Sequence, residues 1–170
     1  STEMALSRTA TALVAGFVAL SAPVLAQEIT VTHAQGETTL PGIPEKVLTQ
    51  DWAVFDDLNA LGITVAGVPS SNAPSYLADA IPADALQLGS LFEPDFEGIA
   101  ASESDVYLVA ARSAAALETS KDILPTIDLS VNNDSIIDGV KNNMTLLGEV
   151  FGLEVEAAEL NANLDAKITE

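Results

Sequence analysis

The 170-residue sequence contains no cysteine and only one histidine, His33. Without cysteine the chain has no disulfide framework, no thiolate metal site and no cysteine nucleophile. A single histidine gives little basis for a Ser-His-Asp triad or a multi-histidine zinc site, so we expect a structural role for His33 and no metal ion held by the protein itself. No glycine-rich phosphate-binding motif follows any predicted strand, so nucleotide binding lacks support. These absences favour a domain that is not an enzyme and has no cofactor.

Positive charge is also scarce. The chain has 6 Lys and Arg residues against 25 Asp and Glu residues, which gives a net charge of -19. A nucleic-acid partner requires a basic surface, and anionic membranes attract basic segments, so the charge argues against both partners. The composition, with 48% hydrophobic and 18% charged residues, is typical of a folded domain whose acidic residues form a solvated surface.

The first 26 residues have the pattern of a secretory signal peptide. Arg8 supplies a short positive segment, residues 10–22 form an apolar run, and a small-residue cleavage site ends at Ala26. Residues 1–3 precede the first methionine, and we expect them to lie upstream of the native start. The apolar run is short for a membrane span, and no cysteine follows it that a lipid could modify. We therefore expect a soluble, monomeric periplasmic protein that is neither a lipoprotein nor inserted in the membrane after cleavage.

Strands alternate with helices along residues 27–170, which predicts an α/β fold with a mainly parallel, Rossmann-like sheet flanked by helices. The pattern predicts a hairpin over 29–40, strands at 46–49, 65–68, 86–88, 106–110 and 126–129, and helices at 52–61, 76–80, 96–101, 114–124, 136–151 and 155–168, with Asp134 as the N-cap of the 136–151 helix. Ligands of such sheets bind beyond the carboxyl ends of the strands. The loops expected to form a site are therefore 50–52, 69–74, 89–95 and 111–113.

Phrases in and around these loops resemble those of a known family. They are 31–34 (VTHA) with 44–47 (PEKV), 51–52 (DW) with 58–62 (LNALG), 89–97 (GSLFEPDFE), and 111–113 (ARS) with 124–129 (LPTIDL). Together they resemble the N-terminal lobe of periplasmic iron–siderophore binding proteins of the catecholate type, the substrate-binding components of ABC importers. The resemblance implies two α/β lobes joined by a single long helix, with the ligand held between them. It assigns residues 27–152 to the first lobe and 153–170 to the start of the linking helix, which we expect to be truncated, with the second lobe absent.

Arg112 is the strongest candidate for ligand binding. It follows the predicted buried strand 106–110, and it is one of the five Lys and Arg residues that remain when Arg8 is removed from the total of 6. An iron–catecholate complex is anionic, and a guanidinium offers it several fixed donors while staying charged. The resemblance implies a ligand-binding arginine at this step. The alternative is an arginine at a helix start that pairs with a nearby acid such as Glu118.

Two aromatic and three polar residues complete the predicted site. Trp52 and Phe92 lie on two of the loops that are expected to form the site. Both could pack on a flat aromatic ligand, although core packing is the alternative for both. Ser71, Asn72 and Tyr76 follow the second strand and could donate hydrogen bonds, although turn formation alone also explains the polar loop residues.

Glu97 has a different predicted role. The resemblance implies a surface glutamate on each lobe that docks on arginines of the membrane permease, and the segment EPDFE matches the one that carries it. Glu93 is the competing candidate. The alternative for Glu97 is stabilisation of a helix N-terminus by a nearby carboxylate.

The resemblance implies that the protein captures a ferric siderophore and delivers it to an inner-membrane ABC permease. The siderophore oxygens would hold the iron, and we expect the protein to supply a basic pocket inside its acidic surface. Other ligands on the same scaffold, such as haem, cobalamin or another metal chelate, remain open, as does a non-binding acidic exported domain. A Rossmann-like enzyme is a more distant alternative, because the chain lacks the glycine fingerprint and the nucleophile elbow.

Overall fold

The computed structural model of the chain describes residues 16–19, 27–132 and 134–169. Most of the predicted signal peptide lies outside these residues, so that assignment stays a prediction. The described fold begins with an antiparallel hairpin of β1 (Ile29–His33) and β2 (Gly36–Leu40), in which Ile29 pairs with Leu40 and His33 with Gly36. The predicted hairpin is therefore confirmed.

Five short strands form a parallel sheet in the order β5-β4-β3-β6-β7. They are β3 (Val47–Thr49), β4 (Gly67–Val68), β5 (Leu86–Gln87), β6 (Val106–Val109) and β7 (Thr126–Asp128). Because every neighbouring pair in this sheet is parallel, the carboxyl ends of all five strands lie at one edge. The chain moves from the central β3 first to one side and then to the other. The predicted α/β class with a parallel sheet is confirmed.

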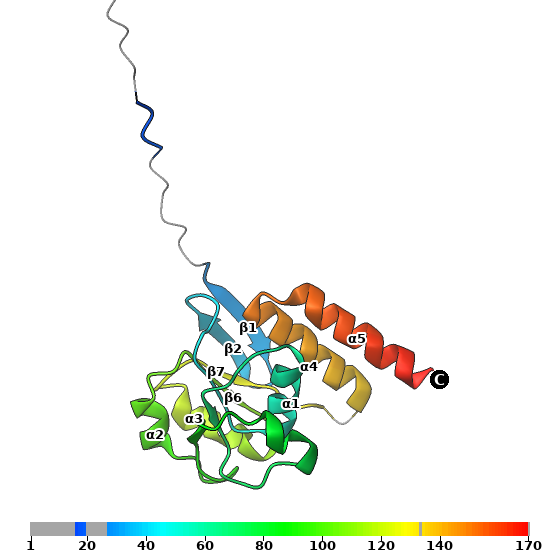
Figure 1. Ribbon diagram of the computed structural model, residues 1–170. Coiled ribbons are helices and arrows are strands. Elements are labelled where there is room, and N and C mark those ends of the chain that lie inside the picture. The colour runs from blue at the N-terminus through cyan, green and yellow to red at the C-terminus, as the bar shows by residue number, and fades with distance from the viewer. Residues whose placement is uncertain (1–15, 20–26, 133, 170) are drawn as a thin grey trace, which may run out of the picture.

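One face of the sheet is covered by α1 (Trp52–Ala60) and α4 (Ile136–Phe151) (Figure 1). Their apolar side chains share one buried cluster with Val47, Val106 and Leu108. The strand residues of this cluster alternate with those of the other face, as the two-residue period of a strand requires.

The opposite face is covered by two shorter helices, α2 (Phe96–Ala101) and α3 (Leu117–Ser120). A second buried cluster joins them to Leu48, Tyr107 and Val109. Because β3 and β6 are buried on both faces, their sequences are largely apolar, which is the pattern of a central parallel strand.

The last helix, α5 (Glu154–Ile168), runs antiparallel to α4 and leads to the C-terminus (Figure 1). Lys141 Nζ donates to Asp165 Oδ2 at 2.9 Å across the pair. At the other end a Cβ added to Gly148 would lie 2.7 Å from the Ala157 Cβ, so the two helices approach closely there. No helix in the described ranges is long and apolar enough to cross a membrane.

Three details of the predicted helices differ in the structure. The N-cap of α4 is Ser135, whose Oγ accepts from Asp138 N at 3.4 Å, and not Asp134. The helix predicted over 114–124 is instead a 3₁₀ turn, η2 (Ala111–Ala116), followed by the single turn of α3. The helix ends early because residues 121–124 must turn into an extended segment before Pro125, which cannot continue a helix. The predicted helix over 76–80 is also a 3₁₀ helix, η1 (Ser75–Ala80).

Candidate ligand-binding site

The candidate site lies at the carboxyl ends of the strands, where Gln50 joins two of the loops. Gln50 follows β3 and is fully buried. Its Nε2 donates to the carbonyl oxygens of Leu88, Gly89 and Ser90 at 3.2, 3.0 and 3.0 Å. Its Oε1 accepts from Tyr107 Oη at 2.7 Å, and burial raises the pKa of that hydroxyl. Because both polar ends of the side chain are satisfied inside the core, the start of the 89–95 loop is held firmly against β3.

The loop after β4 is tied to both of its neighbours. Ser70 N donates to Gly89 O at 2.8 Å, and Gly89 N donates back to Ser70 Oγ at 3.0 Å. On the other side, Trp52 Nε1 donates to Ser71 Oγ at 3.1 Å. The loops after β3, β4 and β5 therefore form one connected platform, which brings together two of the predicted site residues, Trp52 and Ser71.

Phe92 is displayed by a tight loop. Gly89 has a φ of +82°, and a Cβ at this position would lie 2.6 Å from Glu93 O, so both the conformation and the space require glycine. Asp95 N closes the loop on Leu88 O at 2.8 Å. The Phe92 side chain is 75% exposed, so the alternative of core packing is wrong for this residue. A large aromatic side chain held in solvent by a fixed backbone is available to a ligand.

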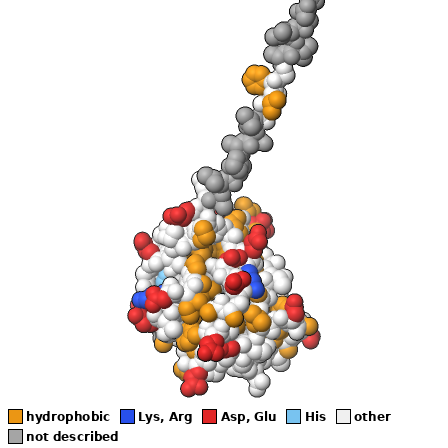
Figure 2. All heavy atoms as spheres, turned by 90° about the vertical axis from the view of Figure 1, so that its left-hand side faces the viewer, with side chains coloured by type: hydrophobic (Ala, Val, Ile, Leu, Met, Phe, Trp, Pro, Cys, Tyr) orange, Lys and Arg blue, Asp and Glu red, His pale blue; other side chains and the backbone are white. Residues whose placement is uncertain are grey.

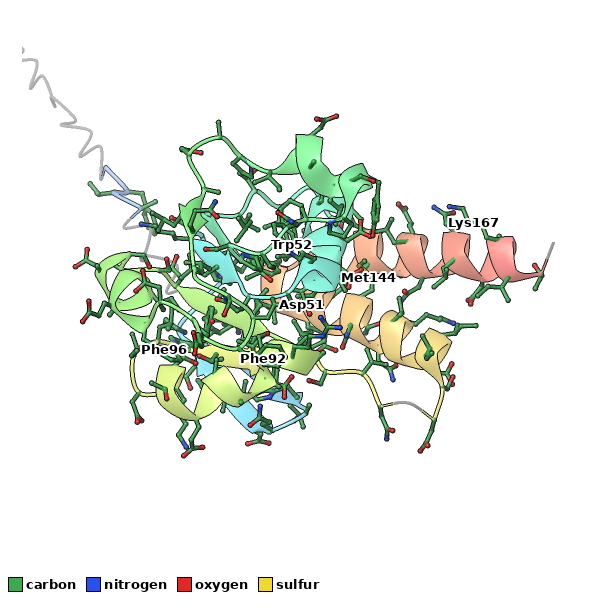
Figure 3. All side chains as sticks on the ribbon, turned by 90° about the horizontal axis from the view of Figure 1, so that it is seen from below. Asp51, Trp52, Phe92, Phe96, Met144 and Lys167 are labelled. Carbon is green, nitrogen blue, oxygen red and sulfur yellow. The ribbon has the colours of Figure 1, made fainter. Side chains whose placement is uncertain are left out.

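Trp52 has a mixed role. It is the first residue of α1, and its ring packs edge-on against Phe55 with the centroids 5.5 Å apart. The side chain is half-buried and packs against the core, while its Nε1 reaches Ser71 in the loop after β4. Asp51 caps the helix by accepting from Val54 N at 2.9 Å. Figure 3 shows Asp51 and Trp52 near the middle of the molecule, with Phe92 below them and Met144 of α4 to their right.

Arg112 lies in the turn directly after β6, as predicted, and its side chain is exposed. The preceding residue, Ala111, adopts a left-handed conformation with a φ of +51°. The alternative ion pair with Glu118 is not formed, because Glu118 pairs with Lys121 at 3.2 Å. Within the residues that the structure describes, no carboxylate forms a salt bridge with Arg112. Its charge is therefore available to an anionic ligand.

A cavity of about 490 Å³ opens at the carboxyl ends of β3, β6 and β7, between α1 and α4. Its lining combines apolar side chains of α1 and α4 with three carboxylates, Asp51, Asp56 and Asp57. No Lys or Arg occurs among the described residues that line it. The expectation of a basic pocket is therefore wrong for this cavity, and Arg112 directly follows Ala111, which is one of its lining residues. Among the charged side chains on the face shown in Figure 2, Asp and Glu outnumber Lys and Arg.

The three carboxylates of the cavity, Asp51, Asp56 and Asp57, form an acidic wall, and burial changes its protonation. Burial, followed by the neighbouring charges of Asp56 and Asp51, raises the pKa of Asp57 from 3.8 to about 7. Burial also raises the pKa of Asp51, although its hydrogen bonds from Val54 N and Ala53 N oppose the change. Near neutral pH about half of the Asp57 population is uncharged, so the wall repels an anion less than three full charges would.

The remaining predicted ligand residues are placed unevenly. Tyr76 lies on η1 at the rim of the cavity, where its Oη donates to Asp56 Oδ2 at 3.1 Å, and this bond raises the Tyr76 pKa. Asn72 is exposed in the 69–74 loop, and no hydrogen bond joins its side chain to another described residue. The structure thus brings Tyr76 to the cavity and leaves Asn72 outside the platform contacts.

Glu97 and Glu93 are both exposed near the start of α2. Glu97 lies in the first turn, two residues after the N-cap Asp95, whose Oδ1 accepts from Gly98 N at 3.1 Å. Glu93 precedes the helix, and its backbone N donates to Ser90 Oγ at 3.0 Å. Both carboxylates are accessible to a partner, and their docking role stays a prediction.

His33 lies in the hairpin, whose turn contacts the carboxyl end of β7. Its Nε2 is 2.8 Å from Thr38 Oγ1, and its Nδ1 accepts from Asp128 N at 3.3 Å, so it links the hairpin to β7. Burial lowers the pKa of His33, and the charge of Asp128 opposes this only in part. No group of three or more potential metal ligands is present in the described part of the chain.

Three residues of the site were not predicted from the sequence. Gln50 carries no recognisable signal, because a glutamine after a strand is ordinary until its burial is known. The pair Asp56-Asp57 fits a solvated helix face, and the sequence does not reveal that α4 closes over it.

Residues 47–170 match the sequence profile of the family described as "Periplasmic binding protein". The chain belongs to this family. The family is one of binding proteins.

Among its relatives is the petrobactin-binding protein YclQ of Bacillus subtilis, which is 31% identical over 148 residues, covering 85% of this chain and 47% of that protein. The crystal structure of YclQ matches with a TM-score of 0.80, covering 84% of this chain and 52% of that one. The ferric-anguibactin-binding protein FatB of Vibrio anguillarum is 28% identical, covering 84% of this chain and 46% of that protein. The periplasmic catecholate-siderophore binding protein VctP of Vibrio cholerae is 27% identical, with a TM-score of 0.78 and coverage of 84% and 52%.

These matches confirm the resemblance to siderophore-binding proteins. The chain spans about half the length of the curated relatives it matches.

Proposed function

We propose that this chain forms the first ligand-binding lobe of a protein that captures a ferric siderophore of the catecholate type and delivers it to an ABC permease. The observation that carries the proposal is the construction of the strand ends. Phe92 is exposed there on loops that are hydrogen-bonded into one platform. Arg112 is exposed there too, and it has no carboxylate partner among the described residues. The names of the relatives point to the same class of ligand.

Each predicted residue has a role in this proposal. Arg112 donates to the anionic oxygens of the chelate, and Phe92 and Trp52 pack on its aromatic rings. Ser71 orients Trp52, and Tyr76 forms the rim of the cavity. Asn72 donates to the ligand from the edge of the platform. The iron is cargo held by the siderophore, so the protein needs no metal ligands of its own.

The remaining predictions belong to the same proposal. Residues 27–152 form the lobe, and 153–170 begin the helix that leads toward a second lobe. Glu97, with Glu93 as the competing candidate, docks on basic residues of the permease. Residues 1–26 direct export to the periplasm, where the protein acts as a soluble monomer that is not lipid-anchored.

Trp52 is the only tryptophan of the chain, so its fluorescence reports directly on the carboxyl ends of the strands. We would titrate the chain, and a longer form with whatever its gene encodes after residue 170, with the iron(III) complex of 2,3-dihydroxybenzoate. Saturable quenching that Arg112→Ala weakens at least tenfold is expected, because a charge-assisted contact is worth about 1.5 to 3 kcal/mol.

Lys121→Ala is the matched control, since it removes an exposed cation that already pairs with Glu118. Equal losses in the two variants would show that only net charge matters. If neither form of the chain binds the iron complex but one binds haem or cobalamin, the siderophore assignment is wrong. If nothing binds, the non-binding alternative takes its place.

A further inference from the structure

The backbone that carries Arg112 is held in an unfavourable conformation. Ala111 has a φ of +51°, in the left-handed region that a residue with a Cβ rarely adopts. Among the described residues other than glycine, only Glu103 shares a positive φ, and it lies in the turn after α2, away from the strand ends. A strained residue persists only when its surroundings hold it, and such residues concentrate at functional sites.

Ser130, which follows β7 on the neighbouring strand, supplies the contact that holds Ala111. Ala111 N donates to Ser130 Oγ at 2.9 Å. The single proton of the Ser130 hydroxyl is donated to Asp128 Oδ1 at 2.6 Å, and Ser130 N donates to the same oxygen at 2.9 Å. Because Asp128 takes the hydroxyl proton, a lone pair of Ser130 Oγ is left facing the Ala111 N–H.

Asp128 is itself fixed from a distant part of the chain. Its side chain is buried, and its second oxygen, Oδ2, accepts from Gln35 Nε2 at 2.8 Å. The same Gln35 nitrogen donates to Ala114 O at 2.8 Å, which lies two residues beyond Arg112. Three donors therefore satisfy the carboxylate, and hydrogen bonds to a charged acceptor are stronger than neutral ones.

Ser113 also holds this turn, through two hydrogen bonds to Ala110. Ser113 Oγ accepts from Ala110 N at 3.1 Å and donates to Ala110 O at 3.0 Å. With Ser113 on one side and Ser130 on the other, the residues on either side of Arg112 have little freedom to move.

We propose that Ser130, oriented by Asp128, is a positioning residue that fixes the backbone at Ala111 and so presets the direction in which Arg112 leaves β6. The inference rests on the proposed function, since Arg112 is the group that meets the ligand there. A preset arginine loses less conformational freedom when it binds an anion, so the brace raises affinity without touching the ligand.

A double-mutant cycle tests the inference, with the iron(III) complex of 2,3-dihydroxybenzoate as the probe and Trp52 fluorescence as the signal. Ser130→Ala is expected to weaken binding about fivefold when Arg112 is present, the size of one lost hydrogen bond. In the Arg112→Ala background the same change is expected to alter binding less than twofold. Ser130→Thr keeps the hydroxyl and is expected to restore most of the affinity.

Ser102→Ala is the matched control, because Ser102 is also a buried serine, whose Oγ donates to Ile99 O at 2.6 Å away from the strand ends. It is expected to lower stability but not affinity. An equal loss of affinity from Ser130→Ala in both backgrounds would overturn the inference, as would no loss at all, while the proposed function would stand.

A second measurement needs no ligand. Amide hydrogen exchange of Ala111 is expected to accelerate at least fivefold in Ser130→Ala and to stay unchanged in Ser102→Ala. Unchanged exchange in Ser130→Ala would overturn the brace itself. If exchange accelerates in Ser130→Ala but the parent protein binds no ferric chelate, the hydrogen-bonded brace is supported. The proposed function and the role assigned to Arg112 are then overturned.

Discussion

Replacing Asp57 with Asn is expected to stabilise the protein at neutral and alkaline pH and to have almost no effect near pH 4. The Asp57 carboxyl is largely buried between α1 and α4, and its pKa rises from 3.8 to about 7. Below pH 3.8 the group is neutral in both the folded and the unfolded chain. Between pH 3.8 and 7 the unfolded chain loses this proton while the folded chain keeps it, so the free energy of unfolding falls as the pH rises.

The magnitude follows from the same pKa. A rise from 3.8 to about 7 corresponds to about 4 kcal/mol of unfavourable free energy for the ionised folded state. Solvent reaches part of the side chain and screens it, so we expect about 2 to 4 kcal/mol. Asn has nearly the shape of the protonated acid and never ionises, so Asp57→Asn removes this cost.

Urea unfolding at several pH values between 4 and 8.5 measures the effect. The difference between variant and parent is expected to grow from near zero at pH 4 to its full value above pH 7. Asp79→Asn, which removes an exposed carboxylate of η1, is the control and is expected to change stability by less than about 0.5 kcal/mol. A difference that does not vary with pH, or a less stable Asp57→Asn variant at pH 8, would refute the reasoning.

Three further changes test how the candidate site is built. Gln50→Leu removes the acceptor of Tyr107 Oη and one donor from each of three carbonyl oxygens. It is expected to destabilise the protein by about 3 kcal/mol in urea unfolding, with faster amide exchange in the 89–95 loop. Gly89→Ala places a Cβ against Glu93 O at a positive φ, so a loss of at least about 2 kcal/mol is expected in thermal unfolding, and an unchanged Tm would contradict this close approach. Ala111→Gly is expected to leave the free energy of unfolding unchanged or to raise it, because glycine removes the left-handed strain. The control Ala162→Gly, within α5, is expected to lower it by about 1 kcal/mol. Equal losses in the two variants would show that Ala111 is not strained.

Local patterns accounted for most of the secondary structure. The hairpin, the five parallel strands and α1, α2, α4 and α5 follow the predicted ranges closely, because apolar periodicity and glycine stops are properties of neighbouring residues. The prediction was poorest over 111–124, where the backbone depends on distant groups. Ala111 N donates to Ser130 Oγ, which in turn donates to Asp128, so the contacts of this turn come from the next strand.

The resemblance carried in the loop phrases located Arg112 and Phe92 at the strand ends, and the structure leaves both exposed there. The charge of the neighbouring cavity could not be predicted in the same way. Asp57 and the residues of α4 are about eighty positions apart, and only packing brings them to one wall.

The sequence by itself thus determined the fold class, since this depends on the order of apolar and polar residues along the chain. The family followed from the resemblance in the loop phrases. Only the tertiary structure decided that Gln50 binds three loop carbonyls, that Asp57 is partly buried and that the turn before Arg112 is strained. These features arise from contacts between segments far apart in the chain, and no local pattern encodes them.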